Sequence, residues 1–453
     1  GLGGLQQYYL PGVRGFERTL QAYSASFRTK LRRFELVSLT GYNINDSTGT
    51  LDWSYYYAPT FQPIFGVTGA IHTNHTTTTR FTEEVRLSSS VAWKFDWQVG
   101  TFYSHEDRAN DQHLRAVDPV TGRVVGEFGH YQYPEQYDTS ATFGDVTFHL
   151  AKRIDLQVGG RLSHDTLNEE AGISAGIDVG GGINIAPASM TTFNTFTYLI
   201  TPRFNLAPNV MLYGRAASGF RPGQSNAVTA ALVTEKIPLQ AEPDKTENYE
   251  IGVKGDFLEH KASVDASLYY IDWQHIQIGV LTEKAAWGYT ANGGRAKSEG
   301  VELSGTVRPL AGLRIAAWGV LNNAVLTEPF PANSTAHGAV GDRLPEGSRH
   351  SGNVSIDRSF PLWNRAVGSV GGKVSYIGDR LGAFTVASSR RDEYPAYSKT
   401  DLNAGLKYSS WTTNVYVSNV FDERGVIGKN PYTLDSLIYI PPRTVGLTFT
   451  RKF

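Results

Sequence analysis

Alternation of apolar and polar residues over strand-length segments is the feature that most limits what this chain can fold into. Residues 246–258 show it most clearly, because apolar side chains occupy one parity and polar or charged side chains the other. The apolar set is Tyr249, Ile251, Val253 and Phe257, and the polar set is Asn248, Glu250, Lys254 and Asp256. Successive side chains of a strand point to opposite faces, so this segment has one apolar and one charged face. Most later segments repeat the pattern, which predicts an extended, repetitive all-β protein.

The spacing of these segments predicts about seventeen strands, joined alternately by short turns and long connections. The expected strands cover residues 18–30, 32–43, 81–91, 94–106, 137–151, 153–166, 191–205, 209–218, 246–258, 261–275, 298–308, 312–326, 349–358, 365–378, 397–408, 411–421 and 443–453. Outer-membrane barrels combine short periplasmic turns with long external loops in this way. The fold class expected is therefore all-β, an antiparallel transmembrane β-barrel. A soluble all-β sandwich remains the alternative.

Composition excludes several other classes of protein. The chain has 453 residues, no cysteine and a formal net charge of −1. It therefore has no disulfide scaffold and no thiolate metal site, and its charge does not favour nucleic acid as a partner. No run of about 18 apolar residues occurs, which excludes a helical membrane protein. Barrel strands escape that test because their inward half is polar.

Five short stretches in the expected order resemble the TonB-dependent outer-membrane receptors. They are Phe81–Ser88; Tyr213 with Ser218, Gly219, Phe220, Arg221, Pro222 and Gly223; Asn248–Lys254; Ser298–Leu303; and Asn419–Asp422. The chain also ends on Phe453, with an apolar set at Val445, Leu447 and Phe449 that Arg451 interrupts. The resemblance covers residues 81–453 and implies a receptor barrel in the bacterial outer membrane, with outer-membrane lipid around it.

Plugged transporters of this kind have 22 strands. Counting back from the last strand, we expect about 17 of the 22 here, and we treat residues 1–453 as one barrel domain that is incomplete at its N-terminus. The chain begins at Gly1 rather than at a methionine, so we expect it to be part of a longer one. The resemblance implies a plug domain upstream that contacts the TonB complex, and we expect that plug to be absent from these residues.

The resemblance further implies TonB-energised uptake of a ferric siderophore or a similar large ligand. Such ligands are often aromatic and anionic, so a site for them needs aromatic faces and cationic donors in the outer loops. The residues expected to bind ligand are Tyr55, Tyr56, Tyr57, Phe220, Arg221, Trp287 and Tyr289. Cobalamin or an oligosaccharide would suit the same surfaces, and a passive porin-like channel is a further alternative.

Other candidate sites have simpler interpretations. His72 and His75 lie in a Thr/Asn-rich stretch that we expect to be loop, and we interpret them as a surface pair rather than metal ligands. The run Gly180–Gly182 has no following Lys-Ser/Thr, so it is interpreted as a loop and not as a phosphate cradle. No catalytic arrangement, metal site or cofactor is expected. Inward-facing charges are expected at Arg161, Arg215, Glu250, Lys254 and Glu302.

Overall fold

The computed structural model describes residues 10–13, 15–89, 94–170, 172–185, 188–226, 237–238, 240–281, 288–332, 337–384, 391–429 and 437–452. Within these ranges, seventeen strands pair in sequence order, each antiparallel to the next, into one large sheet. These strands are β1 (Gly15–Leu31), β2 (Phe34–Asp52), β3 (Gly69–Ser89), β4 (Phe95–Val117), β5 (Val124–Ala151), β6 (Ile154–Glu169), β9 (Ser189–Ala207), β10 (Val210–Arg221), β13 (Asp244–Phe257), β14 (Ala262–Gln274), β17 (Arg295–Val307), β18 (Leu313–Glu328), β19 (His350–Pro361), β20 (Ala366–Ile377), β23 (Tyr397–Tyr408), β24 (Trp411–Ser418) and β27 (Thr444–Arg451). The predicted strand number and antiparallel all-β class are confirmed.

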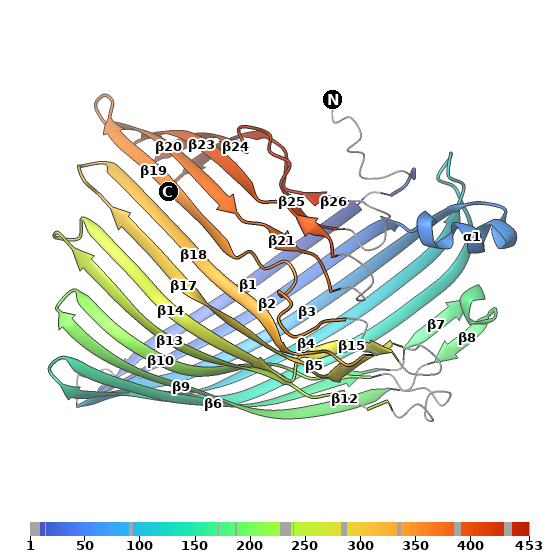
Figure 1. Ribbon diagram of the computed structural model, residues 1–453, viewed down its shortest axis with the longest axis horizontal. Coiled ribbons are helices and arrows are strands. Elements are labelled where there is room, and N and C mark those ends of the chain that lie inside the picture. Colours follow the sequence, from blue (N-terminus) through green and yellow to red (C-terminus); the bar gives the residue numbers. More distant parts are fainter. Residues whose placement is uncertain are drawn as a thin grey trace.

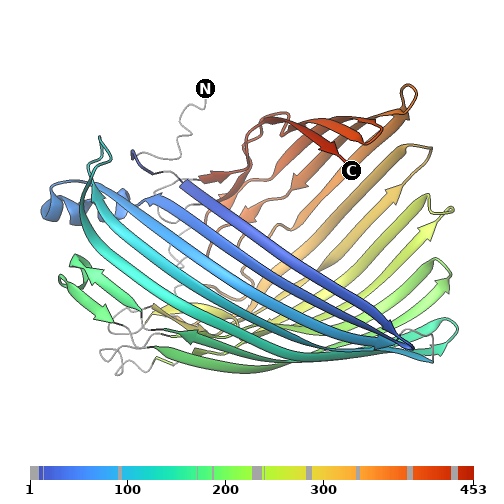
Figure 2. The same ribbon diagram turned by 180° about the vertical axis from the view of Figure 1, so that it is seen from behind.

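The sheet curls into a barrel-like wall whose strands slope across the molecule (Figures 1 and 2). Tight hairpin turns gather at one end of the wall, on the left of Figure 1. Among the described strands, β1 pairs only with β2 and β27 only with β24, so the wall is not closed. Consecutive pairing satisfies the backbone N–H and C=O groups inside the sheet, as a wall in lipid requires.

The longer connections carry short elements at the other end of the wall, which we call the loop end. These are α1 (Ser54–Phe65), β7 (Ile173–Gly176), η1 (Ile177–Val179), β8 (Gly182–Ile185), β11 (Gln224–Ser225), β12 (Gln240–Ala241), β15 (Gln277–Leu281), β16 (Gly288–Asn292), β21 (Arg380–Leu381), β22 (Glu393–Tyr394), β25 (Val426–Lys429) and β26 (Leu437–Tyr439). Among the described residues no helix is both long and apolar enough to cross a membrane.

Cross-strand register confirms the alternation on which the prediction rests. Ile251 lies opposite Leu268, which lies opposite Val301, which lies opposite Leu321, and these four form one apolar row. Their exposed fractions are 61%, 51%, 39% and 61%, so protein does not cover this face. Tyr213 lies on the other face of the sheet and is 8% exposed. The apolar face is therefore exposed at the surface of the wall, as a face that contacts lipid would be.

The opposite face is lined by charges that pair across strands. Tyr213 Oη donates to Glu250, and Lys254 Nζ lies 2.7 Å from Asp265 Oδ2. Glu302 lines the same polar recess as these residues. The predicted grouping of Glu250, Lys254 and Glu302 on one face is confirmed, and their contacts hold neighbouring strands together.

The strands nearest the N-terminus are longer than predicted. We expected β2 to end at residue 43 and a loop to continue to about residue 79, but β2 reaches Asp52 and β3 begins at Gly69. The prediction was wrong because the added segments are polar on both faces, for example Thr76–Thr79, and so lack apolar alternation. β4 and β5 likewise have 23 and 28 residues, whereas β23 and β24 have only 12 and 8.

Candidate ligand site at the loop end of the barrel

α1 occupies part of the expected loop between β2 and β3, and its N-terminus is hydrogen-bonded to both of these strands. Ser54 N–H donates to Asp52 Oδ1 at 2.9 Å, and Ser54 Oγ accepts the Ala70 N–H at 3.0 Å. The helix ends at Gly66, whose φ of 73° is left-handed and whose N–H donates to the Gln62 carbonyl. Phe61 is fully buried on the inner side of the helix. α1 is therefore a fixed part of the loop end.

Trp53 and His72 form the base of an aromatic cluster beneath α1. Their rings stack at 4.0 Å, and the Tyr57 ring stacks on Trp53 at 5.8 Å. His72 Nε2 lies 3.1 Å from Gln112 Oε1, and burial lowers the pKa of His72. The prediction of a surface histidine pair was wrong for His72, which is buried. His75 has the opposite parity, is exposed and lies 3.2 Å from Asp46 Oδ2.

The three tyrosines predicted to bind ligand have different environments. Tyr55 and Tyr56 are about half exposed, with fractions of 55% and 51%, and their rings meet edge to face at 5.2 Å. Tyr57 instead packs against Phe61 at 5.5 Å and Phe128 at 5.9 Å. Burial, with a smaller contribution from Asp178, raises the pKa of Tyr57. Tyr55 and Tyr56 are the pair available to a ligand, and Tyr57 supports the helix.

Arg221 stands at a corner where β10, β13 and β15 meet. Its guanidinium pairs with the carboxylate of Asp244, which is 2% exposed, and lies over the Trp273 ring at 5.9 Å. Gln277 Nε2 donates to the Pro222 carbonyl at 2.6 Å. A Cβ at Gly223 would collide with the Ala241 carbonyl and the Phe193 ring, so only glycine fits there. These contacts give the Arg221–Gly223 motif a structural role.

Phe220 and Tyr289, two further predicted ligand residues, lie elsewhere on the loop end. Phe220 is half-buried in β10 opposite Lys245. Tyr289 lies in β16 and packs against a buried cluster that contains Ile276 and Ile278. Trp287 lies outside the described residues. The predicted residues that the structure describes are therefore distributed over α1, the β10 corner and the β15–β16 hairpin, and among these described residues no contact joins all three places.

Sequence analysis missed a second group of cationic and aromatic side chains at the loop end. Arg391 lies over the Phe384 ring at 4.6 Å, and its Nη1 donates to the Arg343 carbonyl at 2.8 Å. Burial lowers the pKa of Arg391. Arg380 is buried between the Tyr394 and Tyr397 rings. The signal was available, since arginines and aromatics recur between residues 380 and 397.

The Asn419–Asp422 motif fastens the end of β24 to the start of β27. Asn419 is 1% exposed, and its Nδ2 donates to the carbonyls of Glu423 at 2.9 Å and Pro441 at 3.0 Å. Asp422 Oδ1 accepts the Arg443 N–H at 2.9 Å, which lowers the pKa of Asp422. Both residues have left-handed φ, at 52° and 55°, a conformation that Asn and Asp tolerate well. This motif is structural.

Comparison with known proteins identifies the architecture. A family model described as TonB dependent receptor-like, beta-barrel matches residues 2–420. The metal-pseudopaline receptor CntO of Pseudomonas aeruginosa is 26% identical over 230 residues, which are 49% of this chain and 30% of that receptor. The pesticin receptor of Yersinia pestis is 24% identical over 294 residues, which are 63% of this chain and 39% of that protein.

Solved structures share the fold. The ferric yersiniabactin uptake receptor FyuA from Yersinia pestis superposes with a TM-score of 0.74 and 17% identity, covering 96% of this chain and 61% of that chain. The chain thus spans less than two thirds of each of these proteins. The apolar row described above is the lipid-facing surface that a barrel of the outer membrane needs. The chain belongs to the TonB-dependent receptor-like β-barrel family of outer-membrane proteins.

Proposed function

We propose that the protein is an outer-membrane receptor for TonB-energised uptake of a ferric siderophore or a similar large metal chelate. The observation that carries the proposal is a receptor-family barrel wall with aromatic and guanidinium side chains grouped at its loop end. In this proposal residues 1–453 supply barrel wall, and energy for uptake comes through contact of the receptor with the TonB complex. The receptors named above act on metal–pseudopaline, pesticin and ferric yersiniabactin.

The chemistry of the loop end suits an aromatic, anionic ligand. Tyr55 and Tyr56 offer exposed rings beside each other on a helix whose N-terminus is hydrogen-bonded to β2 and β3. Arg391 holds a guanidinium among backbone carbonyls and against Phe384, where an anionic group would gain charge-assisted hydrogen bonds. Trp287 and Tyr289, with Phe220 and Arg221, complete the proposed set.

Growth under iron limitation tests the ligand class. A strain lacking the gene should fail to grow on at least one ferric siderophore of a panel, and the intact gene should restore growth. The defect should be reproduced when TonB is inactivated, because a passive channel would continue to work without it. A defect on cobalamin or on an oligosaccharide, with normal iron-limited growth, would replace the siderophore assignment.

Substitutions in the intact receptor test the residues. Tyr55→Ala with Tyr56→Ala should weaken binding of the siderophore identified by growth about tenfold or more, since each lost aromatic contact is worth about 0.5–1.5 kcal/mol. Tyr249→Ala is the matched control, because Tyr249 is 45% exposed but has the same parity as Ile251 in β13 and therefore faces lipid. Equal binding by both variants would remove α1 from the site.

A further inference from the structure

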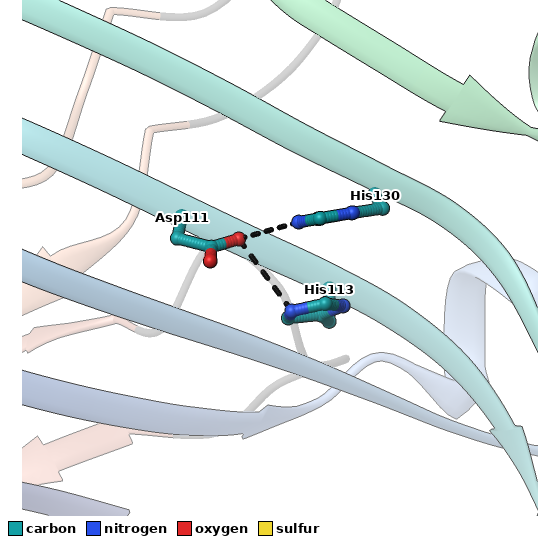
Figure 3. A group of neighbouring side chains, drawn as sticks. All are labelled: Asp111, His113 and His130. Atoms are coloured by element: carbon teal, nitrogen blue, oxygen red, sulfur yellow. Dashed lines mark hydrogen bonds and ion pairs between the residues drawn. The ribbon is translucent and has the colours of Figure 1, made fainter. Parts of the chain in front are cut away.

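Asp111, His113 and His130 form a compact group on one face of the β4–β5 pair (Figure 3). His113 on β4 lies directly opposite His130 on β5, and Asp111 has the same parity as His113. Gln112 and Leu114 have the other parity, and they contact His72 and the Phe61 cluster. The group therefore lies on the sheet face opposite α1 and its aromatic cluster.

The three side chains direct their ligand atoms toward one point. His130 Nε2 lies 2.7 Å from Asp111 Oδ1, and His113 Nε2 lies 3.5 Å from the same oxygen. The imidazole rings stack at 4.1 Å with an interplanar angle of 10°, which brings both Nε2 atoms to the same side. One ligand atom from each residue lies within 4.8 Å of the others.

A second carboxylate orients one of the imidazoles. His113 Nδ1 lies 2.6 Å from Glu127 Oε1, and Arg115 Nε lies 3.7 Å from Glu127 Oε2. A carboxylate that accepts the Nδ1–H fixes the tautomer and leaves the Nε2 lone pair free, the arrangement seen behind metal-bound histidines. Glu127 is thus placed as a partner behind the ligand rather than as a ligand.

This tautomer creates an electrostatic problem that a cation solves. When His113 donates its Nδ1–H to Glu127, the lone pair of a neutral ring faces the Asp111 carboxylate, which is also an acceptor. At 2.7 Å from Asp111 Oδ1, His130 Nε2 donates a hydrogen bond to the carboxylate. A metal ion bound by Nε2 of both imidazoles and by Asp111 takes the place of that proton, which is released on binding. Zn²⁺ takes nitrogen at about 2.0–2.1 Å and carboxylate oxygen at about 2.0–2.2 Å, so small side-chain rotations close the site.

We propose that Asp111, His113 and His130 bind a divalent transition-metal ion of the Zn²⁺ class, with Glu127 as the orienting partner. The ion joins β4 to β5 next to two register shifts in their ladder, between Leu114 and Arg115 and between Ala116 and Val117. The ion, which we call the clasp, holds together the segments of β4 and β5 that extend toward the loop end. This role is independent of the uptake proposed above, because the site lies on the opposite face from the α1 cluster.

Metal titration of the untagged, full-length protein in detergent tests the proposal. Zn²⁺ should bind by calorimetry, and Co²⁺ should give the visible absorption bands of a site with nitrogen and oxygen ligands. His113→Gln with His130→Gln should remove one equivalent of Zn²⁺. Glu127→Gln should keep the stoichiometry and weaken affinity about 10–100-fold.

His149→Gln is the matched control, because His149 also contacts two carboxylates, Asp96 at 3.0 Å and Asp155 at 2.7 Å, but has no second imidazole beside it among the described residues. This variant should bind as much Zn²⁺ as the parent protein. Equal binding by the parent and the double glutamine variant, or none by the parent, would overturn the proposal.

Limited trypsin digestion supplies a measurement that does not depend on stoichiometry. Zn²⁺ should slow cleavage after Arg123, in the connection that the clasp closes, for the parent and for His149→Gln. It should leave the rate unchanged for the double glutamine variant, while a shared circular dichroism spectrum verifies that all three proteins fold. Protection of the double variant by Zn²⁺ would place the ion elsewhere.

Discussion

The wall around β13–β18 and the extension of β2–β5 toward the loop end belong to one continuous sheet, yet different interactions specify them. In the wall, Ile251, Leu268 and Val301 form an apolar row on one face and charges occupy the other. In the extension, threonines, histidines and carboxylates replace the exposed apolar row, and apolar residues such as Ala70 and Leu114 are buried beneath α1. Lipid on one side imposes alternation, whereas water on both sides does not.

In the extension, where apolar and polar residues no longer alternate, charged side chains pair across neighbouring strands. Arg80 pairs with Glu106, and Arg108 Nη1 lies 3.1 Å from Glu135 Oε2, so consecutive strands of the extension are linked by charge. Exposed pairs of this kind contribute only about 0–1 kcal/mol each. The extension therefore depends mainly on its backbone ladder and on a few buried anchors, and the following substitutions test that contrast.

A large effect is expected at the Arg221 corner. Arg221→Ala should cost about 3 kcal/mol of folding free energy, because it leaves the buried Asp244 carboxylate without its guanidinium. Urea unfolding of the full-length protein in lipid vesicles measures the change. Adding Asp244→Asn should recover most of the loss, and a cost below about 1 kcal/mol for the single variant would show that the corner is not an anchor.

The same new charge should affect the two regions differently. Ile251→Arg places a guanidinium on the lipid-facing row and should cost about 2–4 kcal/mol near mid-membrane. Thr79→Arg, which introduces the same side chain at the start of the extension, should cost about 0–1 kcal/mol. Vesicle unfolding free energies give both values, and equal costs would mean that the membrane boundary lies elsewhere.

Asn419 provides a smaller test at the end of the short strands. Asn419→Ala removes an amide that satisfies the Glu423 and Pro441 carbonyls, and it also places alanine at a φ of 52°. The expected cost is about 2 kcal/mol, from buried groups left unpaired. Asn403→Ala, at an exposed position of β23, should change stability by less than about 0.5 kcal/mol. A cost for Asn419→Ala no larger than for Asn403→Ala would contradict the structural role.

The smallest effect is expected in the extension itself. Glu106→Gln should lower stability by less than about 1 kcal/mol, and about 1 M salt should abolish the difference from the parent. Unfolding curves at low and high salt measure it. A loss of several kcal/mol that persists in salt would show that the Arg80–Glu106 pair is an anchor and not a marginal contact.

Sequence reasoning succeeded where one physical rule acts on many residues. The strand number, the faces of Ile251 and Glu250 and the apolar set Val445, Leu447 and Phe449 all follow from alternation, and the last three are each more than 60% exposed. Arg451, the exception in that strand, lies over the Trp411 ring at 4.8 Å. This cation–π contact stabilises the Arg451 charge at the end of the wall where the tight hairpin turns gather.

Sequence reasoning failed where both faces of a strand have the same environment, and where the residues in contact are distant in sequence. The polar extension of β3 had no apolar period to detect, and α1 contains Pro59 and Pro63, which argue against a helix in local sequence. Arg221 meets Asp244 and Gln277 only through the fold. His113 and His130 are 17 positions apart in a chain that has 11 histidines, so their pairing required the β4–β5 register.

The unequal strand lengths have a consequence for access from outside the cell. A barrel strand crosses the bilayer in about 9–11 residues, so β4 and β5, with 23 and 28 residues, exceed that length by about 12 and 17 residues. By contrast, β23 with 12 residues is about as long as the crossing, and β24 with 8 residues is shorter than it. Within the described strands the rim is therefore high on one side and low on the other. To a bulky solute diffusing along the membrane surface, the β4–β5 side therefore presents a taller strand wall than the β23–β24 side.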